Sequence, residues 1–535
     1  MASACSLTLD FDECSTDAQC ATLAAPGQVL VCSAQGFCVE GEVIDDEPDA
    51  DDEPDVDDEP DVDDPPEDVV DDVPDEPDVE ECCTHSQCAD EQGANFICNP
   101  QCECVNALSA ECFAIEGPID NDNVFFIGSV LPTRGPNASK GIPREQAIQM
   151  AVSEFNQNGG LGNGRRIVHI GCDDDGDAEQ GKRAAEHLAN VVGVSAIVGP
   201  AFSSVFIDVS DQVTSQSDVM IMSPSATSAS ITTLDDNGLS WRAVPSDAFQ
   251  GVAMADRVRD LSAMLEGDIK IAAFGKDGAY GNGLLNKLSE ELAFEVGDGN
   301  FEGAIYDPDQ DLATPVIQII DELGAADFVL LFGTNEVVTI IQTYEDQVAE
   351  RGLTPPKYIL SDGGQALELL AFVEQNPDLA GRIEGVAPDT KNGRLYTAYN
   401  QRFRNRYGVD AGSFSANAYD AAYLLSYGAI LLPQDEPVTG TALAGTMEFL
   451  IQGSKLETGP SNIGTARNIL LSGNPINYEG ASGNLQFDLD TGDSAANVIL
   501  WLVGQDARLD YEFQDTMTYR IGDDGLTGMW GMLEE

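Results

Sequence analysis

The pattern of apolar and polar positions changes at about residue 121. From there to the C-terminus, short apolar runs bounded by turn residues alternate with longer amphipathic segments, which indicates strands alternating with helices. We expect strands over 124–130, 166–171, 195–198, 219–222, 269–274, 327–332 and 357–360. Helices are predicted over 142–158, 178–192, 248–265, 283–294, 312–323 and 335–351. Repeated strand–helix units predict parallel sheets covered by helices, and about 400 residues of them favour two lobes over one sheet.

Small hydroxyl residues follow the two apolar runs at 195–198 and 219–222. They are Ser203 and Ser204 after the first run, and Ser223, Ser225 and Thr227 after the second. Ligands of open parallel sheets bind outside the carboxyl ends of the strands, where free backbone N–H groups and hydroxyls suit a carboxylate. The alternative is that these residues only cap the helices that follow.

Cysteines concentrate before residue 113, where twelve of the thirteen occur. Two modules, over 1–41 and 82–120, share a pattern: CSTDAQC and VLVCSAQGFCV in the first, CTHSQC and NFICNPQCECV in the second. Such density indicates disulfides and an oxidising compartment, whereas zinc is disfavoured by the spacings and by the presence of only three histidines. The second module holds seven cysteines, so a bridge from Cys112 to Cys172 would tie it to the rest of the chain.

The segment over 42–81 joins the modules with a degenerate DEPDxD repeat. Charge repulsion and proline keep such a segment disordered and extended, with a reach of about 120 Å in a polyproline-like form. The chain as a whole has a net charge of -69, and its first Lys or Arg is Arg134. This balance excludes nucleic acid as a partner, as well as electrostatic adsorption to anionic lipid.

The first residues lack the charged and apolar regions of a signal peptide, and no apolar run in the sequence is long enough to span a bilayer. Ala2-Ser3-Ala4-Cys5 nevertheless resembles the end of a bacterial lipoprotein signal, with Cys5 as the lipid-bearing residue. The alternative is that Cys5 joins a disulfide. The modules themselves resemble cysteine-rich repeats of surface proteins of Gram-negative bacteria, which predicts a periplasmic or cell-surface location.

Nine motifs from about residue 121 onward carry a wider resemblance. They are FFIGSVLPTRGP, AVSEFNQNGGLGNGRRI, CDDDGDAEQGKRAAEHL, AIVGPAFSS, MIMSPSATS, GKDGAYGNGL, ADFVLLFG, SANAYDAAYLL and INYEGASGNLQFDLDTGD. Together they resemble type I periplasmic binding proteins, in particular the leucine/isoleucine/valine-binding proteins of ABC transporters. The resemblance implies an α/β fold of two Rossmann-like lobes with parallel sheets and a hinge of three crossovers. One lobe would comprise about 121–245 and 386–485, the other about 246–385 and 486–535.

The resemblance also implies a site for an amino acid between the lobes. Ser203 and the turn Ser225-Ala226-Thr227 would hold its carboxylate, with the Ser225 carbonyl and the Thr227 hydroxyl also facing its ammonium group. Tyr280 would close over the ligand and Asp362 would pair with the ammonium, unless Tyr280 is ordinary packing and Asp362 a helix N-cap. A positive charge near Lys140, where relatives often have an aromatic residue, disfavours a plain aliphatic ligand.

Enzymatic activity is not predicted. The sequence lacks G-x-S-x-G, H-E-x-x-H and P-loop motifs, its acidic clusters do not complete a calcium loop, and neither a cofactor nor a metal is expected. The predicted function is extracytoplasmic capture of a small ligand, an amino acid, for an ABC permease, with a lipid anchor as the only membrane contact. The alternative is a surface sensor or adhesion receptor that uses the same fold without a transporter.

Overall fold

The computed structural model describes residues 30–32, 38–40, 82–297, 299–391, 393–433, 436–521 and 527–533. Cys5, most of the first cysteine module and the segment 42–81 lie outside these residues. The chain forms two separate units, Met1–Val79 and Glu80–Glu535. In the first, β1 (Leu30–Cys32) pairs antiparallel with β2 (Cys38–Glu40). Among the described residues, no helix has the length and apolar character needed to cross a bilayer.

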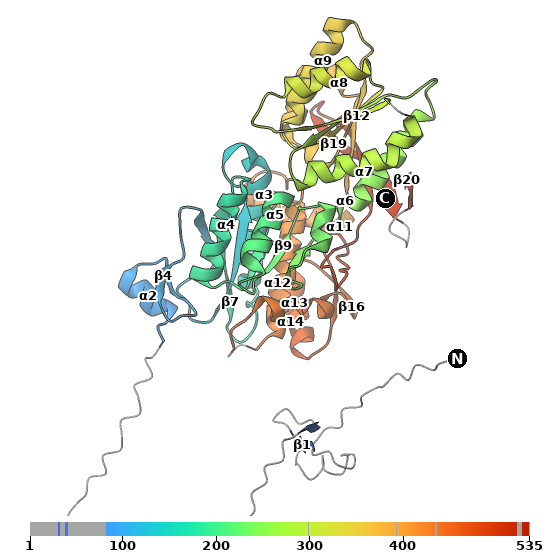
Figure 1. Ribbon diagram of the computed structural model, residues 1–535. Helices are drawn as coiled ribbons and strands as arrows, with labels where there is room; N and C mark the ends of the chain where they lie inside the picture. The colour runs from blue at the N-terminus through green and yellow to red at the C-terminus, as the bar shows by residue number, and fades with distance from the viewer. Residues whose placement is uncertain are drawn as a thin grey trace, which may run out of the picture. The chain divides into compact units, whose positions relative to one another are not determined.

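The first lobe of the second unit is built on a sheet with the strand order β10-β9-β8-β6-β7-β5. Strands β7 and β9 of this sheet are labelled in Figure 1. Its parallel strands are β6 (Val124–Leu131), β7 (Arg166–Asp173), β8 (Ala196–Val198), β9 (Met220–Ser223) and β10 (Ser240–Arg242). The edge strand β5 (Cys112–Glu116) runs antiparallel to β7, although it belongs to the range predicted as the second cysteine module.

Helices cover both faces of this sheet. One face packs on α3 (Ala138–Gln157), α11 (Gly393–Tyr407), α12 (Ser415–Leu431), α13 (Gly440–Ala444) and α14 (Ile463–Leu471), beside a small pair formed by β16 (Ser454–Glu457) and β17 (Ile476–Glu479). The other packs on α4 (Ala178–Glu186) and α5 (Ser203–Val209), each continued by a short π-helix. Since apolar strand residues are buried on both faces, the strands occur in the sequence as short apolar runs.

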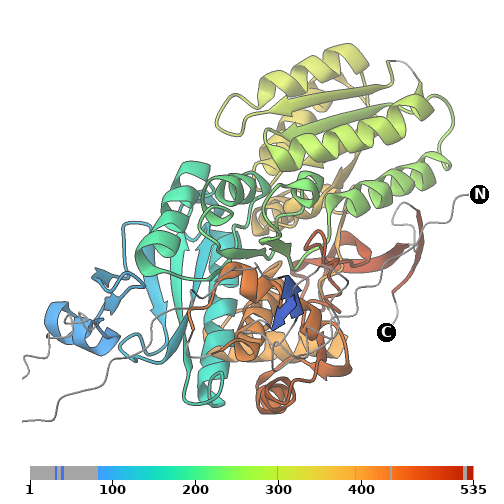
Figure 2. The same ribbon diagram turned by 60° about the horizontal axis from the view of Figure 1, so that its bottom comes forward.

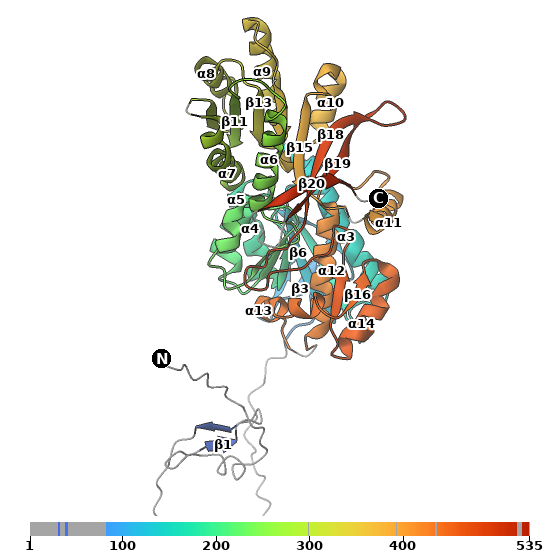
Figure 3. The ribbon, with the colours of Figure 1, turned by 90° about the vertical axis from the view of Figure 1, so that its right-hand side faces the viewer.

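The second lobe has the strand order β12-β11-β13-β14-β15-β18-β19-β20. Its parallel strands are β11 (Ile271–Lys276), β12 (Phe301–Tyr306), β13 (Phe328–Phe332), β14 (Lys357–Leu360) and β15 (Ile383–Pro388). Antiparallel strands β18 (Val498–Gln505), β19 (Tyr511–Ile521) and β20 (Gly528–Met532) extend it (Figure 3). Helices α6 (Asp247–Ser262) and α7 (Ala279–Val296) pack on one face; α8 (Ala313–Leu323), α9 (Val337–Arg351) and α10 (Leu367–Gln375) pack on the other.

Within the described residues, the chain crosses between the two sheets three times (Figure 2). The crossings lie between β10 and α6, between β15 and α11, and between β17 and β18. The fold is therefore the predicted pair of Rossmann-like lobes joined by three crossovers. The antiparallel strands are additions at the edge of each parallel sheet.

The cysteine-rich segment that precedes the first lobe contains α2 (His85–Gln92), β3 (Phe96–Cys98) and β4 (Cys104–Asn106). Its disulfides are Cys82–Cys102, Cys83–Cys98 and Cys88–Cys104. Cys112 is bonded to Cys172, its register partner on β7, so the predicted tie to the main domain is confirmed. Ile97 and Ala107 are buried in the core of the first lobe, which shows that the module is packed against it.

Candidate functional site

A cavity of about 210 Å³ lies between the lobes. Four residues predicted from the sequence line it: Ser203 and Ser225 from the first lobe, and Tyr280 and Asp362 from the second. The first lobe also contributes Lys140, Arg144, Phe202 and Phe414, and the second lobe Lys276. The cavity walls therefore combine hydroxyls, the carboxylates of Asp277 and Asp362, cationic groups and aromatic rings.

In the wall formed by the first lobe, one serine hydroxyl is free to donate a hydrogen bond and another is free to accept one. Ser203 Oγ accepts a hydrogen bond of 3.1 Å from the Ser228 N–H, so its own proton is available to a ligand. Ser225 Oγ instead donates to the Ala201 carbonyl at 2.9 Å, which leaves only its lone pairs free. Ser203 also begins α5, where the first backbone N–H groups have no intrahelical acceptor. This wall thus offers donors for a carboxylate and an acceptor for an ammonium group.

Ala226 and Thr227 do not line the cavity. Ala226 is buried, and its N–H donates to Ser223 Oγ at 2.8 Å. The Thr227 carbonyl accepts from Arg242 Nη1 at 3.1 Å and from the Asp247 N–H at 2.7 Å. These two residues shape the turn that carries Ser225, and the Thr227 carbonyl is already paired at the hinge.

Asp362 and Tyr280 form the wall of the second lobe. The Tyr280 hydroxyl donates to Asp362 Oδ1 at 2.7 Å and accepts from the Gly363 N–H at 3.1 Å. Gln250 Nε2 donates to Asp362 Oδ1 at 2.9 Å, and also to Asp247 Oδ1 at 2.7 Å. Asp362 is not the N-cap of the following helix, since α10 begins at Leu367 after Ala366. Its side chain is held toward the cavity instead.

Burial sets the protonation of the charged groups in and beside the cavity. It raises the pKa of Asp362, and burial together with the Asp362 charge raises the pKa of Asp247 to about 8. Burial lowers the pKa of Lys140 to about 8 and that of Arg144 to about 10. Both signs of charge are therefore held in a poorly solvated space, where an added ion of either sign can find a partner.

The two lobes contact each other around the cavity. Lys140 Nζ donates to the Gly363 carbonyl at 3.0 Å, and the Ala279 N–H donates to Ser204 Oγ at 3.1 Å. The close approach at Ser204 depends on Gly278, where a Cβ atom would lie 2.7 Å from that hydroxyl oxygen. The two lobes are therefore in a closed conformation. The backbone at Gly278 and Ala279 lies at the contact between them.

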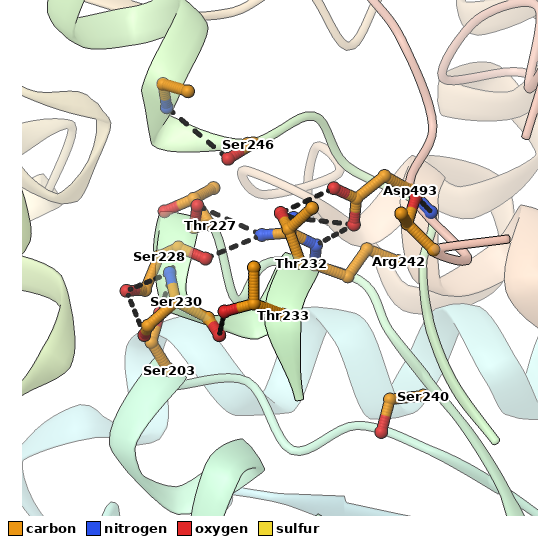
Figure 4. A network of polar contacts seen from close by, with 12 residues as sticks. Ser203, Thr227, Ser228, Ser230, Thr232, Thr233, Ser240, Arg242, Ser246 and Asp493 are labelled. Atoms are coloured by element: carbon orange, nitrogen blue, oxygen red, sulfur yellow. Dashed lines mark hydrogen bonds and ion pairs between the residues drawn. The ribbon is translucent and has the colours of Figure 1, made fainter. Parts of the chain in front are cut away.

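Arg242 connects the site to the hinge (Figure 4). It ends β10 at the first crossover and is fully buried, at 0% exposure. Its guanidinium donates to Asp493, within the third crossover, with Nε at 2.7 Å from Oδ1, and to the Thr227 and Ser228 carbonyls at 3.1 and 2.8 Å. Nη2 donates to Thr232 Oγ1 at 2.8 Å. Because Ser228 N–H binds Ser203 Oγ, this network also fixes the position of Ser203.

Sequence reasoning identified the positive charge at Lys140 but missed Arg144, Lys276 and Phe414. Arg144 follows Lys140 by four residues, a spacing that places both on one face of α3. That spacing was the available signal. Lys276 and Phe414 are brought to the cavity by tertiary packing alone.

Comparison with known proteins places this geometry in context. Residues 125–449 match the family described as periplasmic binding protein. A chemotactic signal transduction system substrate-binding protein of Halobacterium salinarum is 26% identical over 377 residues, 67% of this chain and 82% of that protein. A Leu/Ile/Val-binding protein homolog of Brucella suis is 26% identical over 315 residues, 58% of this chain and 79% of that protein. The fold is shared with the solved structure of an ABC transporter solute-binding protein of Rhodopseudomonas palustris in complex with 3,4-dihydroxy benzoic acid. The TM-score is 0.57 and the sequence identity is 16%, and the match covers 74% of this chain and 97% of that chain.

Proposed function

The chain belongs to the periplasmic binding protein family, and on this premise we propose that it captures an amino acid between its lobes for delivery to an ABC permease. The family and the relatives named above are solute-binding proteins rather than enzymes, and family membership implies an extracytoplasmic location. The relatives support an amino-acid ligand through the Leu/Ile/Val-binding homolog. The ligand class varies within the fold, since the Rhodopseudomonas palustris structure holds an aromatic acid.

The observation that supports an amino acid is the opposition of donors and a carboxylate across the cavity. Ser203, at the start of α5, lines the cavity from one lobe with a hydroxyl that can donate, and Asp362 lines it from the other. A zwitterion needs donors for its carboxylate and an anion for its ammonium group. Ligand contacts made to both lobes at once stabilise the closed form relative to the open form, which is how a partner would detect the ligand.

A sensing role is the second candidate. It is supported by the relative from Halobacterium salinarum, which is named as part of a chemotactic signal transduction system. The disulfide-rich module packed on the first lobe is a further feature of a surface receptor. Neighbouring genes for a permease and ATPases would favour transport, whereas an isolated gene or one beside a sensor kinase would favour signalling.

The proposal includes attachment to the membrane through a lipid on Cys5, with the acidic segment 42–81 as a spacer. Support comes from the sequence Ala2-Ser3-Ala4-Cys5 and from the proline and acidic composition of the spacer. Metabolic labelling with a fatty-acid analogue would show lipid on the natural protein, and Cys5→Ser should abolish it. Equal labelling of the variant would contradict the anchor.

The direct test of binding is a thermal-shift screen of the full chain against the amino acids and small carboxylates. A ligand at one hundred times its dissociation constant adds about 2.7 kcal/mol of stability. Asp362→Ala should weaken amino-acid binding by about 2–5 kcal/mol, because it leaves a buried charge of the ligand unpaired. Asp260→Ala, on the exposed side of α6, is the matched control and should bind normally. Unchanged affinity in Asp362→Ala would remove Asp362 from the site.

A further inference from the structure

Arg144 is a buried cation at the wall of the cavity. It is 4% exposed, and its Nε and Nη1 atoms have neither solvent nor a hydrogen-bond acceptor. Within the described residues it forms no ion pair, in contrast to Arg257, which binds Glu384 through two bonds of 2.7 and 3.0 Å. Arg165, 7% exposed, also lacks an acceptor for Nη1, but it does not line the cavity.

The surroundings of Arg144 hold it in place without neutralising it. Its guanidinium lies 5.5 Å from the centre of the Phe414 ring, and Phe414 has a left-handed backbone with φ of 60°, which is unfavourable for an aromatic residue. Asp174 and Asp362 interact with Arg144 through their charges but stay beyond ion-pair distance. Lys140, one turn away, adds a second positive charge to the same wall.

The unpaired positive charge of Arg144 destabilises the ligand-free protein, and a bound anion would neutralise it. An uncompensated buried charge is unfavourable, whereas a charge-assisted hydrogen bond to a carboxylate would compensate the guanidinium. We propose that Arg144, with Lys140 beside it, receives a second carboxylate of the ligand, so that the solute is an acidic amino acid. This inference rests on the proposed function, in which Ser203 serves the α-carboxylate and Asp362 the ammonium group. An aliphatic side chain would leave the guanidinium unpaired.

Calorimetric titration of the full chain with L-glutamate, L-aspartate, their amides, L-leucine and succinate tests the inference. One acidic amino acid should bind at least about tenfold tighter than its amide and L-leucine. Arg144→Met should weaken binding of that amino acid by roughly ten- to a hundredfold and leave the amide unchanged. Arg144→Lys should restore part of the loss, and Arg508→Met, at an exposed turn, is the control. The ligand-free Arg144→Met protein should melt no lower than the wild type, because the substitution removes an unpaired charge.

The possible failures separate the inference from the proposed function. If the wild type binds L-leucine or an amide as tightly as the acid, the inference is wrong and the amino-acid function stands. If Arg144→Met weakens every amino acid equally, Arg144 holds the α-carboxylate and the inference is again wrong. Succinate binding that depends on Arg144, without amino-acid binding, would support the second-carboxylate site and contradict the role given to Asp362. No binding of any probe would overturn both.

Discussion

Removal of the Asp493 carboxylate should destabilise the protein strongly, because Arg242 would remain buried and charged. Arg242 is 0% exposed, and Asp493 is the carboxylate that pairs with it, at 2.7 Å from Nε and 2.5 Å from Nη2. Breaking a buried ion pair from one side costs about 3–5 kcal/mol. The Asp493 side chain is 15% exposed and the Thr227 and Ser228 carbonyls remain, so we expect Asp493→Ala to cost about 3 kcal/mol, the lower end of this range.

Urea denaturation of the ligand-free protein measures this loss, provided that the two lobes unfold in one transition. A double-mutant cycle with Arg242→Met separates the pair from the rest of the network. The double variant should recover most of the stability, since apolar replacement of both partners of a buried pair is often neutral. A loss below about 1 kcal/mol in Asp493→Ala, or no recovery in the double variant, would refute the view that this ion pair holds the hinge.

Two further predictions concern stability. Replacing Cys112 and Cys172 by Ala should cost roughly 4 kcal/mol in urea denaturation, because the bridge closes a loop of 60 residues; an unchanged midpoint would contradict the structural role of the bridge. The pKa of Asp247 is raised to about 8 by burial and by Asp362, so the folded state retains a proton that the unfolded state loses above pH 4. The free energy of unfolding should therefore fall between about pH 4 and 8, by at most about 1.4 kcal/mol per pH unit, and Asp247→Asn should flatten this decline; an identical slope in the variant would contradict it.

Buried parallel strands were the part of the fold that could be predicted most closely. The strand expected over 166–171 is β7, and the helix expected over 178–192 is α4 with its π-helical continuation. Such strands are apolar on both faces, so the residues at which they begin and end can be recognised as the ends of an apolar run. The edges of the sheets could not be predicted in this way. β12 is half-exposed, and β10 has only three residues, one of which is the paired Arg242.

Residues of the site that belong to a recognisable sequence motif were predicted. Residues that reach the cavity through packing of distant segments were missed. Ser203, Ser225, Tyr280 and Asp362 all line the cavity. The two serines were predicted from the small hydroxyl residues that follow two apolar strands, whereas Tyr280 and Asp362 were predicted from the resemblance to periplasmic binding proteins. Arg144 lies on a helix, where arginine is ordinarily a surface residue. Its guanidinium packs against Phe414, which is distant in sequence, so a local pattern does not reveal its burial.

The central claim, that an amino acid binds between the lobes, is tested most directly by a crystal structure of the chain with the amino acid that gives the largest thermal shift. The account predicts one molecule in the cavity, with its α-carboxylate beside Ser203 and its ammonium group within hydrogen-bonding distance of Asp362. A ligand bound outside the cavity, or one whose ammonium group faces away from Asp362, would contradict it.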